Sequence, residues 1–316
     1  MNPPPPPPPS SPPPSPPAPA SPAPESPVVP KSSSFPRVGL TAIGVAAIRA
    51  AESARPDRLF NDPYAAAFAQ AAGDWRPEPT APPSEEAARR RRALTSWITV
   101  RTRFLDDVVL DACAGSCRQV VILGAGLDSR AFRLAWPEGT RLWELDLADV
   151  IEFKAQVIRS EGWQPRCERT TVPVDLSEDW TQPLLGAGFD ASAPVAWLAE
   201  GLLAYLSEEV RDALVSRAAG VSVPGSRMGV TLAASARLAT WRKAHPDADT
   251  VRGDYVALWQ STAPAEPADW LASFGWDATI FDVADRSAAY GRPLDDSLVN
   301  AEGGRSEARL VDATRL

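Results

Sequence analysis

Residues 119–134, QVVILGAGLDSRAFRL, decide the fold of this chain of 316 residues. The apolar run at 120–123 is typical of a buried parallel strand. The glycines of Gly124-Ala125-Gly126 then predict a sharp turn, and an amphipathic helix is expected over 128–135. A glycine turn between a strand and a helix lets a ligand approach the backbone closely, and it points helix N–H groups at that ligand.

Two kinds of nucleotide site use such a turn. A dinucleotide-binding fingerprint would place its third glycine where Ser129 stands, which argues against an NAD site. With Asp128 after the turn, the segment is instead similar to the first motif of an S-adenosylmethionine (SAM) site. A plain strand-to-helix turn in an α/β protein is the alternative, because short motifs also match by chance.

A second acidic signal follows the glycine turn after about 20 residues. Residues 141–146, RLWELD, form a short apolar strand that contains two acids, Glu144 and Asp146. This is the spacing at which a carboxylate meets a ribose hydroxyl in nucleotide-binding α/β folds. Because side chains alternate along a strand, both acids lie on one face, and either could reach the ribose.

The composition divides the chain into two unequal parts, a tail and a domain. Residues 1–36 contain 18 of the 34 prolines, mixed with Ser and Ala, and predict a disordered or polyproline II tail. A solvated tail is the simpler interpretation, and a ligand for a proline-recognising domain is the alternative. Residues 37–316 are long enough for one large domain and carry the whole formal charge of −8.

The charge of the chain excludes some classes of partner, and its cysteine content indicates the redox compartment. The acidic balance argues against a nucleic-acid or anionic-membrane partner, and no run approaches the ~18 apolar residues of a membrane span. The three cysteines, Cys113, Cys117 and Cys167, form no framework and favour a reducing cytoplasm. With His245 as the single histidine, no metal site is expected.

Strands and helices alternate along the chain, which predicts a doubly wound parallel sheet with right-handed crossovers. Helices are expected at 40–54 and 64–72, with further helical spacing at 97–112. Expected strands are 119–124, 141–146, 169–174, 194–199, 226–232, 276–282 and 308–313. Expected later helices are 128–135, 148–160, 178–187, 207–219 and 267–274. The segment 235–265 is too long for a simple crossover loop and suggests a lid.

Six ordered segments resemble the leucine carboxyl methyltransferase family, and most closely its bacterial SAM-dependent branch. They are AIRAAESARPDRLFNDPYA, VRTRFLDD, VVILGAGLDSRAFRL, LWELDLADVIEFK, VPVDL and WLAEGLLAYLS. The resemblance covers about residues 40–293. It implies a class I methyltransferase (Rossmann-like) α/β fold preceded by N-terminal helices, with strand order 3-2-1-4-5-7-6 and an antiparallel strand 7.

The resemblance also implies which residues bind SAM. Arg101 would face the methionine carboxylate, since a guanidinium fork fits a carboxylate well. Glu200, at the end of the fourth strand, would hold the methionine ammonium. Asp146 would take the ribose hydroxyls, with Glu144 as the fallback.

Further contacts would come from five other positions. Gly124 would lie against the methionine part, and Gly126 of the same turn would also bind SAM. Asp175 and Leu176 would flank the adenine, and Arg49 aligns loosely with a basic residue of the N-terminal helices.

Two of these assignments have structural alternatives. Arg101 could instead pair with Asp106 or Asp107 across a helical turn. Asp175 could simply cap the helix that follows it.

The expected reaction is methyl transfer from SAM to an oxygen. A carboxylate acceptor is already ionised at neutral pH and needs no general base, which agrees with the scarcity of histidine. An O-methyltransferase acting on a carboxylate of a small molecule or peptide is therefore the preferred hypothesis. The alternatives are an NAD-dependent oxidoreductase and a catalytically inactive, methyltransferase-like binding protein.

Overall fold

The seven-stranded sheet expected from the alternating pattern is present in the computed structural model. The model describes Met1 and residues 37–71, 85–232, 260–292, 294 and 308–316. The strand order is β3-β2-β1-β4-β5-β7-β6. β1 to β5 pair in parallel, whereas β7 is antiparallel to β5 and to β6. Both the predicted order and the antiparallel seventh strand are confirmed.

The strands follow the predicted bounds closely, and the helices less so. The strands are β1 Gln119–Leu123, β2 Arg141–Asp146, β3 Glu168–Pro173, β4 Val195–Ala199, β5 Arg227–Leu232, β6 Trp276–Asp282 and β7 Arg309–Arg315. The helices are α1 Arg37–Ser53, α2 Ala65–Ala71, α3 Glu85–Ala114, α4 Arg130–Arg133, α5 Ala148–Glu161, α6 Thr181–Gly186, α7 Glu208–Gly220, α9 Pro267–Ala272 and α10 Val283–Ala289. A short 3-10 turn, η2 Leu203–Tyr205, follows β4.

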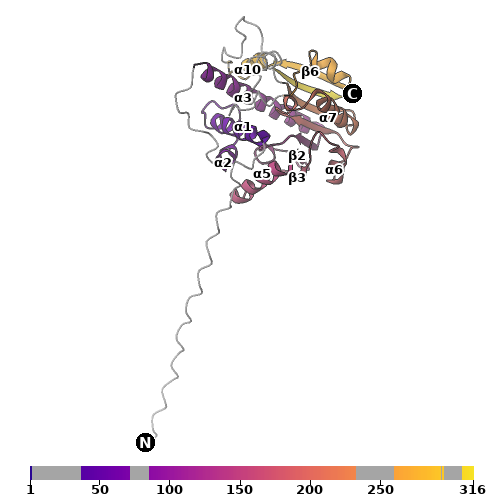
Figure 1. Cartoon of the computed structure of the whole chain (residues 1–316). Coiled ribbons are helices and arrows are strands. Elements are labelled where there is room, and N and C mark those ends of the chain that lie inside the picture. The colour runs from indigo at the N-terminus through magenta and orange to yellow at the C-terminus, as the bar shows by residue number, and fades with distance from the viewer. Residues whose placement is uncertain (2–36, 72–84, 233–259, 293, 295–307) are drawn as a thin grey trace.

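Helices cover both faces of the sheet, as its most buried strands require. Every residue of β1 and of β4 is buried, so neither face of these central strands meets water. Leu184 of α6, Leu214 of α7 and Leu271 of α9 pack into the core of one face. On the other face the core includes Phe132 of α4 and Val283 of α10, together with α3 (Figure 1).

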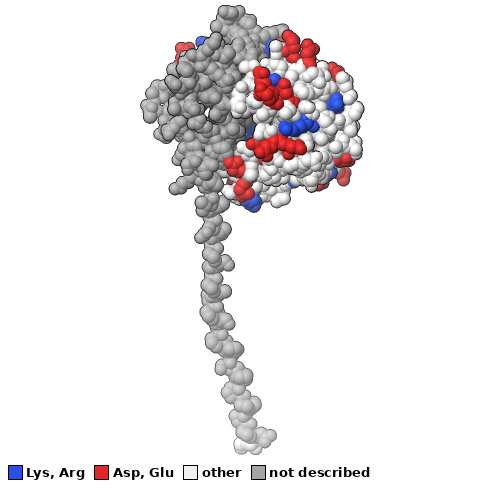
Figure 2. Space-filling view, turned by 45° about the vertical axis from the view of Figure 1, so that its right-hand side comes forward, with Lys and Arg blue, Asp and Glu red and all other residues white. Residues whose placement is uncertain are grey.

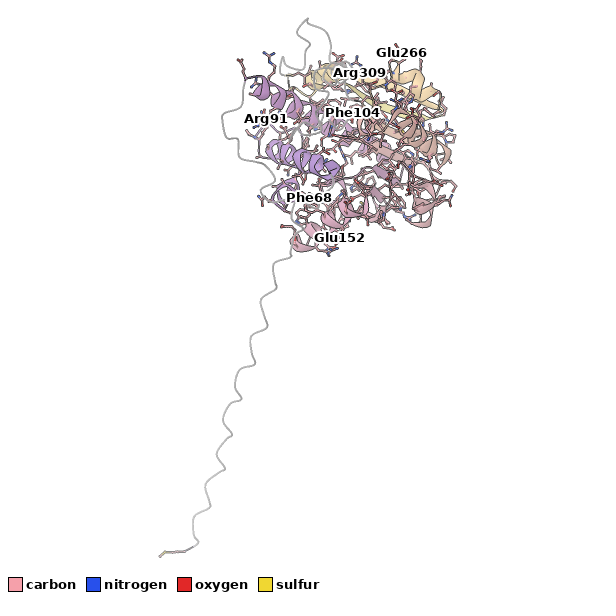
Figure 3. All side chains as sticks on the ribbon, viewed as in Figure 1. Phe68, Arg91, Phe104, Glu152, Glu266 and Arg309 are labelled. Carbon is pink, nitrogen blue, oxygen red and sulfur yellow. The ribbon has the colours of Figure 1, made fainter. Side chains whose placement is uncertain are left out.

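One continuous helix, α3, contains the expected helical segment 97–112 and begins 12 residues before it. It crosses the sheet over Gly229 of β5, where a Cβ atom would lie only 2.8 Å from Leu105 Cδ2 and 3.0 Å from Leu198 Cδ2. The absence of a side chain at Gly229 is therefore what lets α3 approach the sheet so closely. One residue earlier on the helix, Phe104 (labelled in Figure 3) packs against another ring. Its partner is Phe281 of β6, and the ring centroids lie 5.4 Å apart.

The N-terminal helices α1 and α2 form a layer beside the glycine turn. Ile43 and Phe68 from these helices share a small core with Leu127, directly after the turn. A Cβ atom on Gly126 would lie 3.2 Å from Ala42 Cβ, so α1 packs against the turn itself. The proline-rich segment 2–36 and most of the expected lid, residues 233–259, lie outside the described residues.

The surface carries charges of both signs. In the face shown by Figure 2, acidic groups outnumber basic ones, in agreement with the net charge of −8. None of the helices in the described ranges is long and apolar enough to cross a membrane.

Candidate functional site

The glycine turn after β1 is the first part of the site. Gly124 and Gly126 have φ angles of 61° and 47°, in the left-handed region that favours glycine. A Cβ atom on Gly124 would also lie 2.8 Å from Leu202 Cδ1. The N–H of Gly126 donates a 2.5 Å hydrogen bond to Asp146 Oδ2, which ties the turn to the end of β2.

The two acids of β2 have different surroundings. Asp146 is half-buried and accepts hydrogen bonds from the N–H groups of Gly126 and, at 2.7 Å, of Leu147. Burial raises its pKa, although these two donors act in the opposite direction. The carboxylate is therefore held in place at the edge of the sheet by neutral donors.

Glu144 is fully buried and ion-paired. Lys154 Nζ lies 2.6 Å from its Oε2, and Arg169 donates to both oxygens at 2.9 and 2.8 Å. Burial would raise the pKa of Glu144, but the two cations outweigh it and the pKa is lowered. Both oxygens of Glu144 contact cations in the interior, which favours Asp146 over Glu144 for the ribose, and this assignment stays a prediction.

Glu200 follows β4 and forms the second part of the site. Its Oε1 accepts hydrogen bonds from Arg101 Nε at 3.1 Å and Thr102 Oγ1 at 3.0 Å, and its Oε2 lies 2.7 Å from Arg130 Nη1. Burial opposes ionisation, yet Arg130, Arg101 and Arg49 hold the pKa of Glu200 well below its usual range. Glu200 is therefore a carboxylate at neutral pH.

Arg101 does not take the local partners that were its structural alternative. Asp106 pairs with Arg133, among others, and Asp107 pairs with Arg103. Arg101 reaches instead across 99 positions to Glu200, and a Cβ atom on Gly201 would lie 2.7 Å from its Nη1. Within the described part of the chain, no hydrogen bond from either terminal nitrogen of Arg101 is formed.

The structure adds a buried network that the sequence reasoning missed. Arg130 lies 2.8 Å from Asp106 Oδ1 and also pairs with Asp128 and Glu200. Arg133 lies 2.6 Å from Asp106 Oδ2. Together with the Arg49–Asp62 and Arg101–Glu200 pairs, four arginines and four acids form this network, and no side chain in it is more than 10% exposed.

A signal for the network exists in the sequence. Arg130 and Arg133 stand three apart in a short segment that is otherwise largely apolar, and arginines are almost never fully buried unless they are paired. Their acidic partners come from three separate segments, however, and only the fold brings these together.

Arg49 and Asp175 complete the expected set. Arg49 pairs with Asp62 at 3.0 Å and donates to the Leu127 carbonyl, so it joins α1 to the glycine turn. Asp175 is exposed, and its Oδ1 accepts from the N–H and hydroxyl of Ser177, which closes a turn several residues before α6 begins. Leu176 is buried in the core of the sheet.

The cysteine thiols have no role in the candidate site. Burial raises the pKa of both Cys113 and Cys167 to about 12, which makes them poor nucleophiles. Among the residues described, no group of three or more His, Cys, Asp or Glu side chains is arranged to hold a metal ion.

The strand order, the glycine turn and the acids at the carboxyl edge define the class I SAM-dependent methyltransferases. Comparison with known proteins specifies the family. The leucine carboxyl methyltransferase profile matches residues 42–219, which is more than half of the chain. The chain belongs to this family.

Curated relatives agree with the family assignment. A Streptomyces coelicolor protein named "Putative S-adenosyl-L-methionine-dependent methyltransferase" is 49% identical over 278 residues, which cover 88% of this chain and 95% of the relative. A Frankia alni protein of the same description is 46% identical over 279 residues, with the same coverage. The chain is therefore a SAM-dependent methyltransferase, with SAM as co-substrate and a methyl acceptor as second substrate. The NAD alternative finds no support.

A solved structure supports the fold alone. The crystal structure of a DUF574-family protein from Streptomyces avermitilis superposes with a TM-score of 0.52 at 13% identity, over 89% of this chain and 100% of that one.

Proposed function

We propose that this enzyme transfers the methyl group of SAM to a carboxylate oxygen of a small molecule or peptide. SAM supplies a methyl group on a sulfonium leaving group. The acceptor oxygen forms a bond to the methyl carbon as the carbon–sulfur bond breaks, which yields a methyl ester and S-adenosylhomocysteine. The negative charge of the acceptor and the positive charge of the sulfonium both disappear, so no proton has to move.

The observation that carries this proposal is that four acids of the candidate site all have partners. Asp106, Asp128 and Glu200 are paired with arginines, and Asp146 is held by backbone N–H groups. In the part of the chain that the structure describes, none of these four is left as a spare general base. A phenol or amine acceptor usually needs one, whereas an ionised carboxylate does not. His245 lies outside the described residues.

The Arg101–Glu200 pair suits the amino-acid end of SAM. This end carries an ammonium and a carboxylate, and the pair offers a carboxylate and a guanidinium side by side. We infer that Glu200 receives the ammonium and that the terminal nitrogens of Arg101 receive the carboxylate. The close approach of Arg101 to the backbone at Gly201 supports this role, because it fixes the guanidinium beside Glu200.

The remaining contacts are proposed from the same edge. Asp146 would accept hydrogen bonds from the ribose hydroxyls, and Gly124 and Gly126 would line the methionine part. Asp175 and Leu176, which follow β3, would flank the adenine. Arg49 would act from α1 by holding the turn through Leu127.

The acceptor class can be tested by the stability of the product. The enzyme is incubated with SAM labelled in the methyl group and with pools of carboxylic acids and peptides. A carboxyl methyl ester releases volatile labelled methanol in mild alkali, whereas methyl ethers and methylamines keep the label. We expect alkali-labile label that depends on active enzyme.

Glu200→Gln provides the control for enzyme dependence, because it leaves the acceptor chemistry untouched and removes the proposed ammonium contact. Stable, alkali-resistant label that depends on the wild-type enzyme would overturn the carboxylate proposal without affecting the assignment as a methyltransferase.

A further inference from the structure

We propose that Arg130 is a positioning residue for the methyl donor, because it fixes the Glu200 carboxylate in the orientation that receives the ammonium of SAM. Arg130 acts through Glu200 and does not touch the donor itself. The inference rests on the proposed role of Glu200 and extends it to a residue of the first turn of α4.

Arg130 is the most fully committed side chain of the buried network. Its side chain is 1% exposed. Its Nε reaches Asp106, and its Nη1 reaches both Asp128 and Glu200. It also donates to the Thr102 carbonyl at 3.3 Å, and its own N–H donates to Asp128 Oδ1 at 2.7 Å. The guanidinium is therefore locked from several sides and presents Nη1 to Glu200 in one direction.

The consequence for Glu200 is a fixed carboxylate plane. Arg130 holds Oε2, while Thr102 and Arg101 hold Oε1. A carboxylate oxygen can accept two hydrogen bonds, and Oε2 has only the Arg130 contact among the described residues. The second acceptor position of Oε2 is thus available for an ammonium, and Arg130 determines where that position points.

Charge balance gives the same residue a second effect on the site. Arg130 is the cation that contacts three acids, which would otherwise repel one another in a medium that screens poorly. Arg130 therefore keeps Glu200 ionised as well as oriented. Of the cations facing Glu200, Arg130 lowers its pKa most, followed by Arg101 and Arg49.

A purely structural role for Arg130 can be separated from positioning, because the chain offers a matched control. Arg133 lies one turn away on the same helix, its side chain is 4% exposed, and it pairs with Asp106 and lies near Asp62. Arg133 does not contact Glu200. Arg130→Met and Arg133→Met therefore remove one buried arginine each, but only the first removes a contact to Glu200.

The test compares two ligands that differ at the amino-acid end. S-adenosylhomocysteine carries the ammonium and carboxylate, whereas 5′-methylthioadenosine lacks both. Dissociation constants are measured by calorimetric titration for the wild type, Arg130→Met, Arg133→Met and Glu200→Gln, with thermal unfolding as the check on folding. Arg130→Lys keeps the positive charge but places it on a single nitrogen, and it serves as the conservative variant.

We expect Arg130→Met to weaken S-adenosylhomocysteine by roughly ten- to a hundredfold, as for the loss of a contact to a charged group, and 5′-methylthioadenosine by far less. Arg133→Met should lower thermal stability and leave the ratio of the two affinities unchanged. Arg130→Lys should recover part of the wild-type preference for S-adenosylhomocysteine over 5′-methylthioadenosine. If Arg130→Met does not fold, Arg130→Lys is compared with Arg133→Met in its place.

The positioning role is overturned if Arg130→Met and Arg133→Met show the same ratio of affinities for the two ligands. It is also overturned if Arg130→Lys recovers none of the wild-type ratio. Failure of the underlying proposal looks different, because an unchanged ratio in Glu200→Gln would show that Glu200 does not meet the ammonium at all.

Discussion

At the scale of single residues, the two acids of β2 show how strongly burial decides a role. Glu144 and Asp146 stand two apart on one strand, and alternation alone does not distinguish them. Lys154 of α5 and Arg169 of β3 form ion pairs with Glu144, whereas Asp146 accepts a hydrogen bond from the turn after β1. These partners are distant in sequence, so only the fold can separate the two acids.

Asp146→Asn should weaken S-adenosylhomocysteine by about 1.5–3 kcal/mol, because a carboxylate that accepts ribose hydroxyls is replaced by a neutral group. The melting temperature without ligand should change little. Calorimetric titration and thermal unfolding measure the two effects. An unchanged affinity in a folded variant would remove Asp146 from the ribose site.

Glu144→Gln should lower the stability of the fold more than the affinity for S-adenosylhomocysteine, which is the opposite of Asp146→Asn. It leaves Lys154 and Arg169 without a counter-charge in the interior, which typically costs about 3–5 kcal/mol of the free energy of unfolding. Denaturant unfolding measures this loss. If the variant is as stable as the wild type but binds S-adenosylhomocysteine poorly, Glu144 is the ribose residue after all.

The pKa of Asp146 predicts a pH dependence. Burial raises this pKa, so the carboxylate takes up a proton at a higher pH than an ordinary aspartate does. Glu200, whose pKa is lowered, stays ionised over the same range. Affinity for S-adenosylhomocysteine should therefore fall as the pH decreases, and the fall should begin above the range of an unperturbed aspartate. Titrations at a series of pH values should show this fall in the wild type and not in Asp146→Asn.

At the scale of elements, the sheet could be predicted and the helix positions less so. The strands follow from runs of buried apolar residues, and their bounds agree with the structure within two residues. The expected helix at 128–135 shortens to the four residues of α4, because the backbone of Ser129 is not helical and that of Leu134 is already extended, with a ψ of 152°. α10 has no counterpart among the helices expected from the sequence.

The candidate site was predictable only where it lies in one segment. The glycine turn and the two acids of β2 could be recognised because each lies in a short motif. The buried arginine network could not, because Asp62, Asp106 and Glu200 come from separate elements and pair only after folding.

The crossing of α3 over β5 gives a prediction for an element. Gly229→Val should cost about 1–3 kcal/mol of the free energy of unfolding, because the new side chain would collide with Leu105 and Leu198 in a packed core. Gly186→Ala is the control, since a Cβ atom there meets nothing within 4 Å. Chemical unfolding of both variants measures the difference. Equal stabilities would mean that α3 can shift away from the sheet at little cost.

At the scale of the whole molecule, the division into a proline-rich tail and a methyltransferase domain stays a prediction. Deleting residues 1–36 should leave S-adenosylhomocysteine affinity and thermal stability unchanged, because a segment of this composition has no core to contribute. Titration and thermal unfolding of the truncated chain are compared with the full chain. A loss of affinity would show that the tail contributes to the domain.

Partners of the whole chain also stay predictions. A proline-recognising domain is the expected partner class for the tail, if it has one, and the acidic surface argues against nucleic acid. Both can be measured by titration with a proline-binding domain and with duplex DNA.

The burial of the arginine network also divides the ion pairs of this protein by their response to ionic strength. Pairs such as Arg55–Asp57 and Arg159–Glu152, with about half or more of each side chain exposed, are screened by dissolved salt. The Arg130–Asp106 pair, at 1% and 6% exposure, is shielded from mobile ions. Molar sodium chloride should therefore weaken the surface ion pairs by screening. The enzyme should still prefer S-adenosylhomocysteine over 5′-methylthioadenosine under these conditions.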